Sequence, residues 1–188
     1  MRKTPIRPGE YYHIYNRGVE KRNIFLRKNH WGKFLQYLQK YCLPEYGEVL
    51  AYCLMPNHYH LIVFVNTEDF GSTVMMPLAM AYAKAINKEL RRPGHLFQGT
   101  YQAKRIISTE QLIHLSQYVH LNPVVAGFVE SPEDWAYSSY REYIGLRDGS
   151  LPNTSIILAD FVDATEYQAY VEQKRDEKKI HSVIFNEE

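Results

Sequence analysis

The sequence is poor in cysteine and has no long apolar run. Its 188 residues include only two cysteines, Cys42 and Cys53, and they do not form a Cys-x-x-Cys pair. Reduced thiols in a cytoplasmic protein are the simplest interpretation. No stretch of about 18 apolar residues is present, and the basic N-terminal residues are not followed by an apolar segment. We therefore expect neither a membrane span nor a secretory signal.

The net charge of +1 hides an uneven distribution along the chain. Residues 1–129 carry 16 Lys and Arg against 8 Asp and Glu, whereas residues 130–188 carry 6 against 13. A basic body favours a polyanionic partner such as nucleic acid, although a solvated surface balanced by its own acidic segment explains the charge equally well. The composition changes after Gly127, which predicts a domain over 1–129 and a helical acidic extension over 130–188, packed on it or trailing from it.

The hydrophobic periodicity alternates between strand and helix patterns. It predicts strands at 10–18, 48–56, 58–65 and 95–107, and helices at 29–42, 73–92 and 110–122. This order, β-α-β-β-α-β followed by a helix that ends at Pro123, matches the split βαβ arrangement. We expect an α+β, ferredoxin-like fold with an antiparallel sheet and helices on one face. Two further helices are predicted at 131–145 and 160–179.

Two histidines interrupt the apolar stretch CLMPNHYHLIVFV at 53–65. Side chains alternate between the faces of a strand, so His58 and His60 point to one face and Tyr59 to the other. Two imidazoles spaced by roughly 6–7 Å of strand rise can chelate one divalent ion. A purely structural role for the pair is the alternative.

Two other kinds of two-histidine enzyme site do not match the spacing. A cupin-like metal site requires a glutamate a few residues after the second histidine, where Phe64 and Val65 stand. A two-histidine phosphoesterase requires two His-x-Ser/Thr motifs, and the sequence does not contain two.

A second motif, QYVHLNP, complements the histidine pair. Tyr118 and Asn122 are four residues apart and share one face of a helix. If that face covers His58 and His60, Asn122 offers a third ligand and Tyr118 places its phenol beside the ion. A tyrosine has a pKa near 10, so it needs a cation or a base to act as a nucleophile. The alternative for Tyr118 is packing, because the chain has 16 tyrosines.

Three motifs together resemble a known family. MPNHYHLIV, LFQGTYQAKRI and YVHLNPVVAGFV, in this order, are similar to the single-tyrosine HUH transposases, and most of all to the REP-associated tyrosine transposases. HUH stands for histidine, a hydrophobic residue and histidine. The resemblance covers about residues 8–145, and the combination of motifs is more specific than any one of them.

The resemblance implies a site and a reaction. His58, His60 and Asn122 would bind a divalent metal, Mg²⁺ or Mn²⁺. Tyr118 would attack a phosphodiester of single-stranded DNA, leaving a 5′-phosphotyrosine link and a free 3′-hydroxyl. The implied substrates are DNA hairpins with short unpaired flanks, and the implied fold is the ferredoxin-like sheet.

The sequence departs from the family pattern at Val125, where relatives often have arginine, and at Phe97 and Thr100, where tryptophan and a basic residue are common. These changes affect the expected DNA contacts and not the catalytic set. A basic groove with aromatic platforms holds single-stranded nucleic acid. The candidate DNA-binding residues are Arg17, Lys21, Arg22, Arg91, Arg92, Tyr101, Lys104 and Arg105.

Two alternative functions remain open from the sequence. One is a domesticated hairpin-binding protein that no longer cleaves DNA. The other is a metal-dependent phosphohydrolase in which water attacks instead of Tyr118. A homodimer and a monomer are both compatible with the resemblance.

Overall fold

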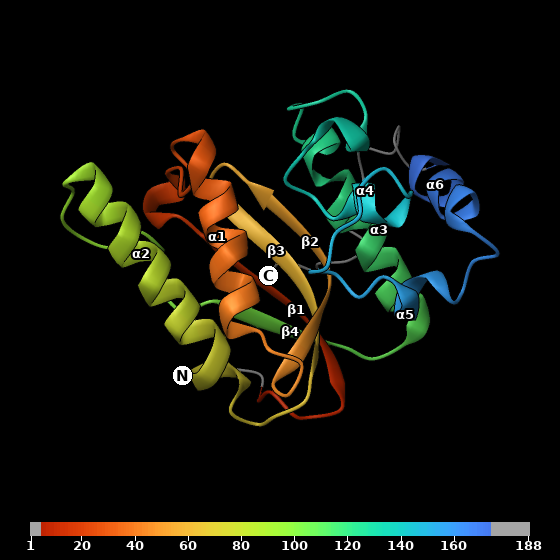
Figure 1. Ribbon diagram of the computed structural model, residues 1–188, viewed down its shortest axis with the longest axis horizontal. Coiled ribbons are helices and arrows are strands. Elements are labelled where there is room, and N and C mark those ends of the chain that lie inside the picture. The colour runs from red at the N-terminus through yellow and green to blue at the C-terminus, as the bar shows by residue number, and fades with distance from the viewer. Residues whose placement is uncertain (1–4, 174–188) are drawn as a thin grey trace.

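Four antiparallel strands form the centre of the molecule. The computed structural model describes residues 5–173, and its sheet has the order β2-β3-β1-β4 (Figure 1). The strands are β1 (Glu10–Arg17), β2 (Gly47–Met55), β3 (His58–Val65) and β4 (Gln102–Ile106). The main helices are α1 (Lys28–Tyr41), α2 (Met76–Leu90), α3 (Thr109–Val125) and α6 (Ala164–Gln173). This arrangement confirms the predicted ferredoxin-like fold.

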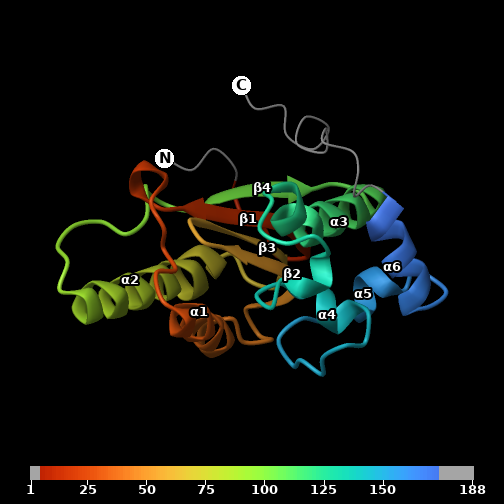
Figure 2. The same ribbon diagram turned by 90° about the horizontal axis from the view of Figure 1, so that it is seen from above.

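Each face of the sheet carries its own hydrophobic core. Helices α1 and α2 cover one face, and α3 lies on the other with the short helices α4 (Tyr140–Tyr143) and α5 (Ser155–Leu158) (Figure 2). Burying one large apolar side chain contributes roughly 1.5–3 kcal/mol, so both layers hold the sheet in place. No helix in the described range is long and apolar enough to cross a membrane.

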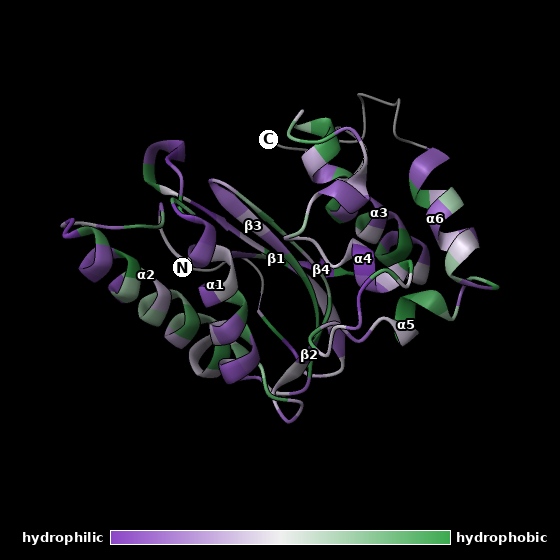
Figure 3. Ribbon diagram, turned by 45° about the horizontal axis from the view of Figure 1, so that its top comes forward, coloured by the Kyte–Doolittle hydropathy of each residue, from purple (hydrophilic) through white to green (hydrophobic). Residues whose placement is uncertain are grey.

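Alternation along β3 divides its side chains between the two cores. Tyr59, Leu61 and Val63 belong to the core under α1 and α2, whereas Ile62 belongs to the core under α3. His58 and His60 have the same parity as Ile62, so they face α3. Figure 3 shows a hydrophilic stretch in the sheet, where β3 pairs with β1.

The predicted end of the helix at Pro123 is wrong. Helix α3 continues through Pro123 to Val125, and the backbone N–H of Ala126 donates to the carbonyl of Asn122 at 3.0 Å. Pro123 lies in the last turn of the helix and is buried, so its burial outweighs the lost N–H donor. Asn122 therefore keeps helical geometry.

The strand predicted at 95–107 begins later in the structure, because the first part of this range is a loop. Only Gln102–Ile106 pairs with β1, and the preceding loop inserts Leu96 and Phe97 into the core under α2. A single bridge joins Phe97 to Gly18. Two consecutive buried side chains do not fit the alternation of a strand, which explains why this segment leaves the sheet.

The other predicted helices also differ in extent. The helix at 73–92 begins with a π-helical turn, Gly71–Met75, before α2. The predicted helix 131–145 is instead a 3-10 turn at Pro132–Asp134 followed by α4. Between them, the carbonyl of Tyr137 accepts from the N–H of Leu54 at 2.9 Å. The segment thus covers the outer edge of β2, which would otherwise expose unpaired backbone groups. Of the predicted helix 160–179, residues 174–179 lie outside the described range.

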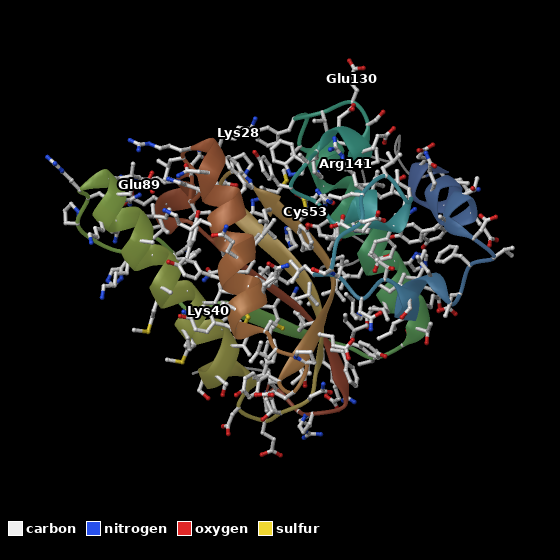
Figure 4. All side chains as sticks on the ribbon, in the orientation of Figure 1. Lys28, Lys40, Cys53, Glu89, Glu130 and Arg141 are labelled. Atoms are coloured by element: carbon white, nitrogen blue, oxygen red, sulfur yellow. The ribbon has the colours of Figure 1, made fainter. Side chains whose placement is uncertain are left out.

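An ion cluster joins α1 to α2. The carboxylate of Glu89, labelled in Figure 4, contacts Lys33 Nζ at 2.8 Å, Arg27 at 3.1 Å and His30 Nε2 at 3.2 Å. The backbone N–H of Leu26 donates to His30 Nδ1, so Nε2 carries the hydrogen that Glu89 accepts. The hydrogen bond from Lys33, followed by that from His30, lowers the pKa of Glu89 to about 2.

We expect the contribution of Glu89 to folding stability to depend on pH. A carboxyl with a depressed pKa stabilises the folded state above its unfolded pKa, near 4.5, and loses this effect as the pH falls toward 2. Glu89→Gln should therefore lower the urea midpoint at pH 7, and the difference from wild type should shrink at pH 3.5. The exposed Glu68→Gln is the control. An equal difference at both pH values would contradict the assignment.

Candidate active site

The two histidines of β3 begin the strand and face α3. In the sheet, His58 lies opposite Arg17 and His60 lies opposite Tyr15. The two imidazole centroids are 4.9 Å apart and the rings are nearly perpendicular, at 87°. His60 is 7% exposed, whereas His58 is half-buried. The pair lies where the buried core gives way to the surface.

Helix α3 brings the other two predicted residues to this position. The ring of Tyr118 meets the ring of His60 edge-on, with centroids 5.5 Å apart and an interplanar angle of 84°. The amide nitrogen of Asn122 lies 3.5 Å from His60 Nε2. Tyr118 and Asn122 are 4% and 5% exposed. Four residues that are up to 64 positions apart in sequence, His58 to Asn122, thus meet in one place.

Both histidines have their Nδ1 atoms engaged by a neighbouring side chain. His58 Nδ1 lies 2.7 Å from Asn57 Oδ1, and His60 Nδ1 lies 2.9 Å from Nε2 of a third histidine, His13. Burial, with the nearby Lys104, lowers the pKa of His13 to about 3, so this imidazole is neutral at pH 7.

The donor set suits a cation that keeps open coordination positions. Within residues 5–173 no group of three His, Cys, Asp or Glu side chains is placed to hold a metal ion. The candidate set instead combines the imidazoles of His58 and His60 with the amide of Asn122, which offers its oxygen after rotation. Three protein ligands leave coordination positions for water or phosphate oxygens.

A buried polar network holds α3 in place beneath Tyr118. His120 Nδ1 lies 2.8 Å from the hydroxyl of Tyr167 on α6, and its Nε2 lies 2.8 Å from Ser139 Oγ. The Tyr167 hydroxyl donates to Ser116 at 3.0 Å, and Ser139 Oγ accepts from the N–H of Tyr52 on β2 at 2.8 Å. Because burial lowers the pKa of His120 to about 3, its imidazole is neutral. This network ties α3 to α6 and to the sheet.

One group of the predicted DNA-binding residues gathers at the His58 end of the sheet. Arg17 is exposed, and its Nε donates to Gln98 Oε1 at 2.6 Å. Lys21 and Arg22 follow in the same loop, where Lys21 adopts a left-handed φ of 58°. The Lys21 carbonyl accepts from Asn57 Nδ2 at 3.1 Å, so the basic loop touches the turn that precedes His58.

The two basic residues of β4 point to opposite faces. Lys104 pairs with His13 in the β1–β4 register and shares its face, which is the face of α3. Arg105 pairs with Tyr12 and forms a 2.8 Å ion pair with Glu10. Alternation therefore directs Lys104, and not Arg105, toward the candidate site.

Three other predicted contacts lie away from Tyr118. Arg91 and Arg92 follow α2, which covers the opposite face of the sheet from α3. Tyr101 is 3% exposed and belongs to the core under α2, so its ring does not form a surface platform for a base. Their DNA contacts stay predictions.

Sequence reasoning left His13 and Asn57 without a role. His13 occupies alternate positions with Tyr11 and Tyr15 in a strand-like stretch, but its contact with His60 depends on the pairing of β1 with β3. Asn57 lies in the turn between β2 and β3, and its position next to His58 is a usable signal in the sequence.

Comparisons with known proteins agree with this geometry. Residues 8–122 match the family model described as "Transposase IS200 like". A relative from Haemophilus influenzae, named "Putative REP-associated tyrosine transposase", is 27% identical over 104 residues, which is 50% of this chain and 59% of the relative. The match therefore spans less than two thirds of that relative.

Solved structures give a second comparison. The structure described as a REP-associated tyrosine transposase bound to a REP hairpin has a TM-score of 0.65 and 18% identity, covering 81% of this chain and 96% of that one. A bacterial tRNA(His) guanylyltransferase-like protein in complex with ATP reaches a TM-score of only 0.38 and has no bearing on fold or function.

The sheet presents a His-x-His pair to a tyrosine of α3, and residues 8–122 match the family model. The chain therefore belongs to the IS200-like transposase family. The relative from Haemophilus influenzae is named a putative REP-associated tyrosine transposase, and the solved structure is described as a REP-associated tyrosine transposase.

We expect Tyr167→Phe to destabilise the fold. The substitution removes the hydroxyl that His120 and Ser116 share in a buried setting, and leaving such groups unsatisfied costs about 1–3 kcal/mol. Urea unfolding at pH 7 measures the change. Tyr37→Phe, at a half-buried position outside this network, is the matched control, and equal stability of the two variants would refute the role of the network.

Proposed function

We propose that the protein is a metal-dependent transposase that cuts and rejoins single-stranded DNA beside a hairpin, with Tyr118 as the nucleophile. The observation that carries the proposal is the convergence of Tyr118, His60 and Asn122 beside the half-buried His58. Membership of the IS200-like family supports the same reaction class. The motif His58-Tyr59-His60 is the HUH element of this site.

The reaction is a phosphoryl transfer in which the number of phosphodiester-type bonds is conserved. The Tyr118 oxygen attacks the phosphorus, the bond from phosphorus to the 3′-oxygen breaks, and the phenol proton ends on the released 3′-hydroxyl. The DNA remains attached through a 5′-phosphotyrosine. Rejoining is the reverse step, in which a 3′-hydroxyl attacks the phosphotyrosine and Tyr118 leaves. No external energy source is needed.

Each residue of the site has a definite task in this scheme. His58, His60 and Asn122 would hold Mg²⁺ or Mn²⁺. When bound, the cation polarises the scissile phosphate and stabilises the charge that develops on it. The edge-on contact with His60 limits where the Tyr118 ring can turn. Because imidazole is a softer ligand than Mg²⁺ prefers, we expect Mn²⁺ to bind more tightly.

The proposed partner is a DNA hairpin with unpaired flanks. The structural relative is described as bound to a REP hairpin, and this chain has the same fold. Arg17, Lys21 and Arg22 lie at the end of the sheet next to His58, and Lys104 shares the face of Tyr118. A strand held by these cations would run toward the nucleophile. Homodimer and monomer both fit this scheme.

We expect Tyr118→Phe to abolish a covalent adduct. The protein is incubated with Mn²⁺ and a labelled hairpin oligonucleotide with single-stranded flanks, and the products are separated under denaturing conditions. Wild type should give a protein–DNA band that the variant lacks, because phenylalanine has no nucleophilic oxygen. Tyr37→Phe is the control and should form the adduct.

The same experiment separates the alternatives. Cleavage that persists in Tyr118→Phe without an adduct would replace the proposal with a phosphohydrolase. Binding without cleavage in wild type, on a cognate hairpin, would identify a domesticated binding protein. Loss of cleavage and adduct in His60→Ala, with unchanged folding, supports the metal site.

We expect Lys104→Ala to weaken DNA binding more than Arg105→Ala. Lys104 faces the candidate site, whereas Arg105 is paired with Glu10 on the other face. Loss of one phosphate contact should reduce the slope of log affinity against log salt by about 1. Fluorescence anisotropy with the labelled hairpin across a salt series measures this slope. A larger loss in Arg105→Ala would contradict the assignment of faces.

A further inference from the structure

The ring nitrogens of the two candidate ligands are controlled by their neighbours. A metal takes the lone pair of a neutral imidazole nitrogen, so a ligand histidine must carry its hydrogen on the other nitrogen. At His58 the arrangement is unambiguous. Asn57 Oδ1 can only accept, so His58 Nδ1 donates the hydrogen and Nε2 keeps its lone pair. Asn57 is itself oriented, because its Nδ2 donates to the Lys21 carbonyl at 3.1 Å.

At His60 the neighbour is another imidazole. His60 Nδ1 and His13 Nε2 are 2.9 Å apart, so one of them carries the hydrogen and the other accepts it. If His13 donated, His60 would carry its own hydrogen on Nε2, which is the nitrogen that faces Asn122 at 3.5 Å. That arrangement would exclude a metal from the position. If His13 accepts, His60 Nε2 is available.

We propose that His13 is a positioning residue that accepts the Nδ1 hydrogen of His60 and thereby keeps His60 Nε2 available as a metal ligand. His13 would thus do for His60 what Asn57 does for His58. The inference rests on the proposed function, because it assigns His13 to the same metal site. It adds a residue that neither the HUH motif nor the helix motif contains.

The surroundings of His13 hold its ring in place. The residue is on β1, one of the two central strands, where it lies opposite Ile62 of β3 and Lys104 of β4, and only 1% of it is exposed. Its ring is nearly parallel to that of His60, with centroids 5.1 Å apart and an interplanar angle of 11°, as expected for two rings joined edge to edge by this hydrogen bond. On another side it stacks on Tyr15, with centroids 4.9 Å apart. These contacts fix the direction of Nε2 more firmly than a surface side chain or a water molecule would.

The tautomers can be measured directly in the metal-free wild-type protein. Long-range ¹H–¹⁵N correlation spectra distinguish a histidine protonated at Nδ1 from one protonated at Nε2. We expect His58 and His60 to carry hydrogen on Nδ1, and the Nε2 of His13 to be unprotonated. A hydrogen on His60 Nε2 in the neutral state would overturn the inference, whether or not the protein cleaves DNA.

Metal affinity provides the second test. His13→Gln keeps an amide oxygen that reaches about as far as Nε2 and can accept the hydrogen, whereas His13→Met fills similar space without a comparable acceptor. We expect Mn²⁺ affinity, measured by the electron paramagnetic resonance signal of free Mn²⁺, to fall about 10–100-fold in His13→Met and to stay near wild type in His13→Gln. The exposed His95→Gln is the control.

The outcomes separate the two claims. If wild type binds Mn²⁺ and His13→Met binds it equally well, the role of His13 is overturned while the proposed function stands. If both His13 variants lose affinity equally, with circular dichroism and urea midpoints like wild type, His13 acts through packing and the inference fails. If wild type does not bind Mn²⁺, the proposed function fails and the role of His13 fails with it. Should His13→Met not fold, the tautomer measurement on wild type decides.

Discussion

The alternation of side chains along β3 is the constraint on which the rest of the structure depends. This one strand supplies Tyr59, Leu61 and Val63 to the core under α1 and α2, and sends His58, His60 and Ile62 toward α3. A shift of one residue in register would move the imidazoles into the apolar core and the aromatic and aliphatic side chains to the candidate site. Because both faces of the sheet are covered by helices, neither set of β3 side chains can move to the other face without disrupting a core. The chemistry of the site and the stability of the sheet are therefore decided by the same pairing.

Helix α3 is held to that sheet by polar as well as apolar contacts. Helix α3 is buried on several sides, because α6 and the segment that covers the outer edge of β2 enclose it. His120 connects these pieces through Tyr167 and Ser139. Hydrogen bonds in a buried network act cooperatively and fix one arrangement, which would suit the role proposed for Tyr118 on the same helix. The region after residue 129 thus contributes to the placement of Tyr118 through contacts that its acidic composition does not reveal.

Two of the basic residues, Lys21 and Lys104, are connected to the candidate site by the sheet and its turns. Lys21 belongs to the basic loop after β1, and its carbonyl orients Asn57, which orients His58. A segment suited to bind phosphate is therefore in contact with a candidate metal ligand through two hydrogen bonds. On β4, alternation gives the site Lys104 and gives the opposite face Arg105. Arg91 and Arg92, although close to this region in sequence, belong to the layer of α2.

The sequence by itself determined the elements whose signals are local. The order β-α-β-β-α-β follows from hydrophobic periodicity, the common face of His58 and His60 from the two-residue repeat of a strand, and that of Tyr118 and Asn122 from the helical repeat. Local patterns do not predict the end of α3 or the loop before β4, because burial of Pro123 and insertion of Phe97 depend on packing partners far along the chain. Only the tertiary structure decided that His13 meets His60 and that His120 meets Tyr167. Each of these contacts joins residues 47 positions apart, and no local pattern carries the register that brings such residues together.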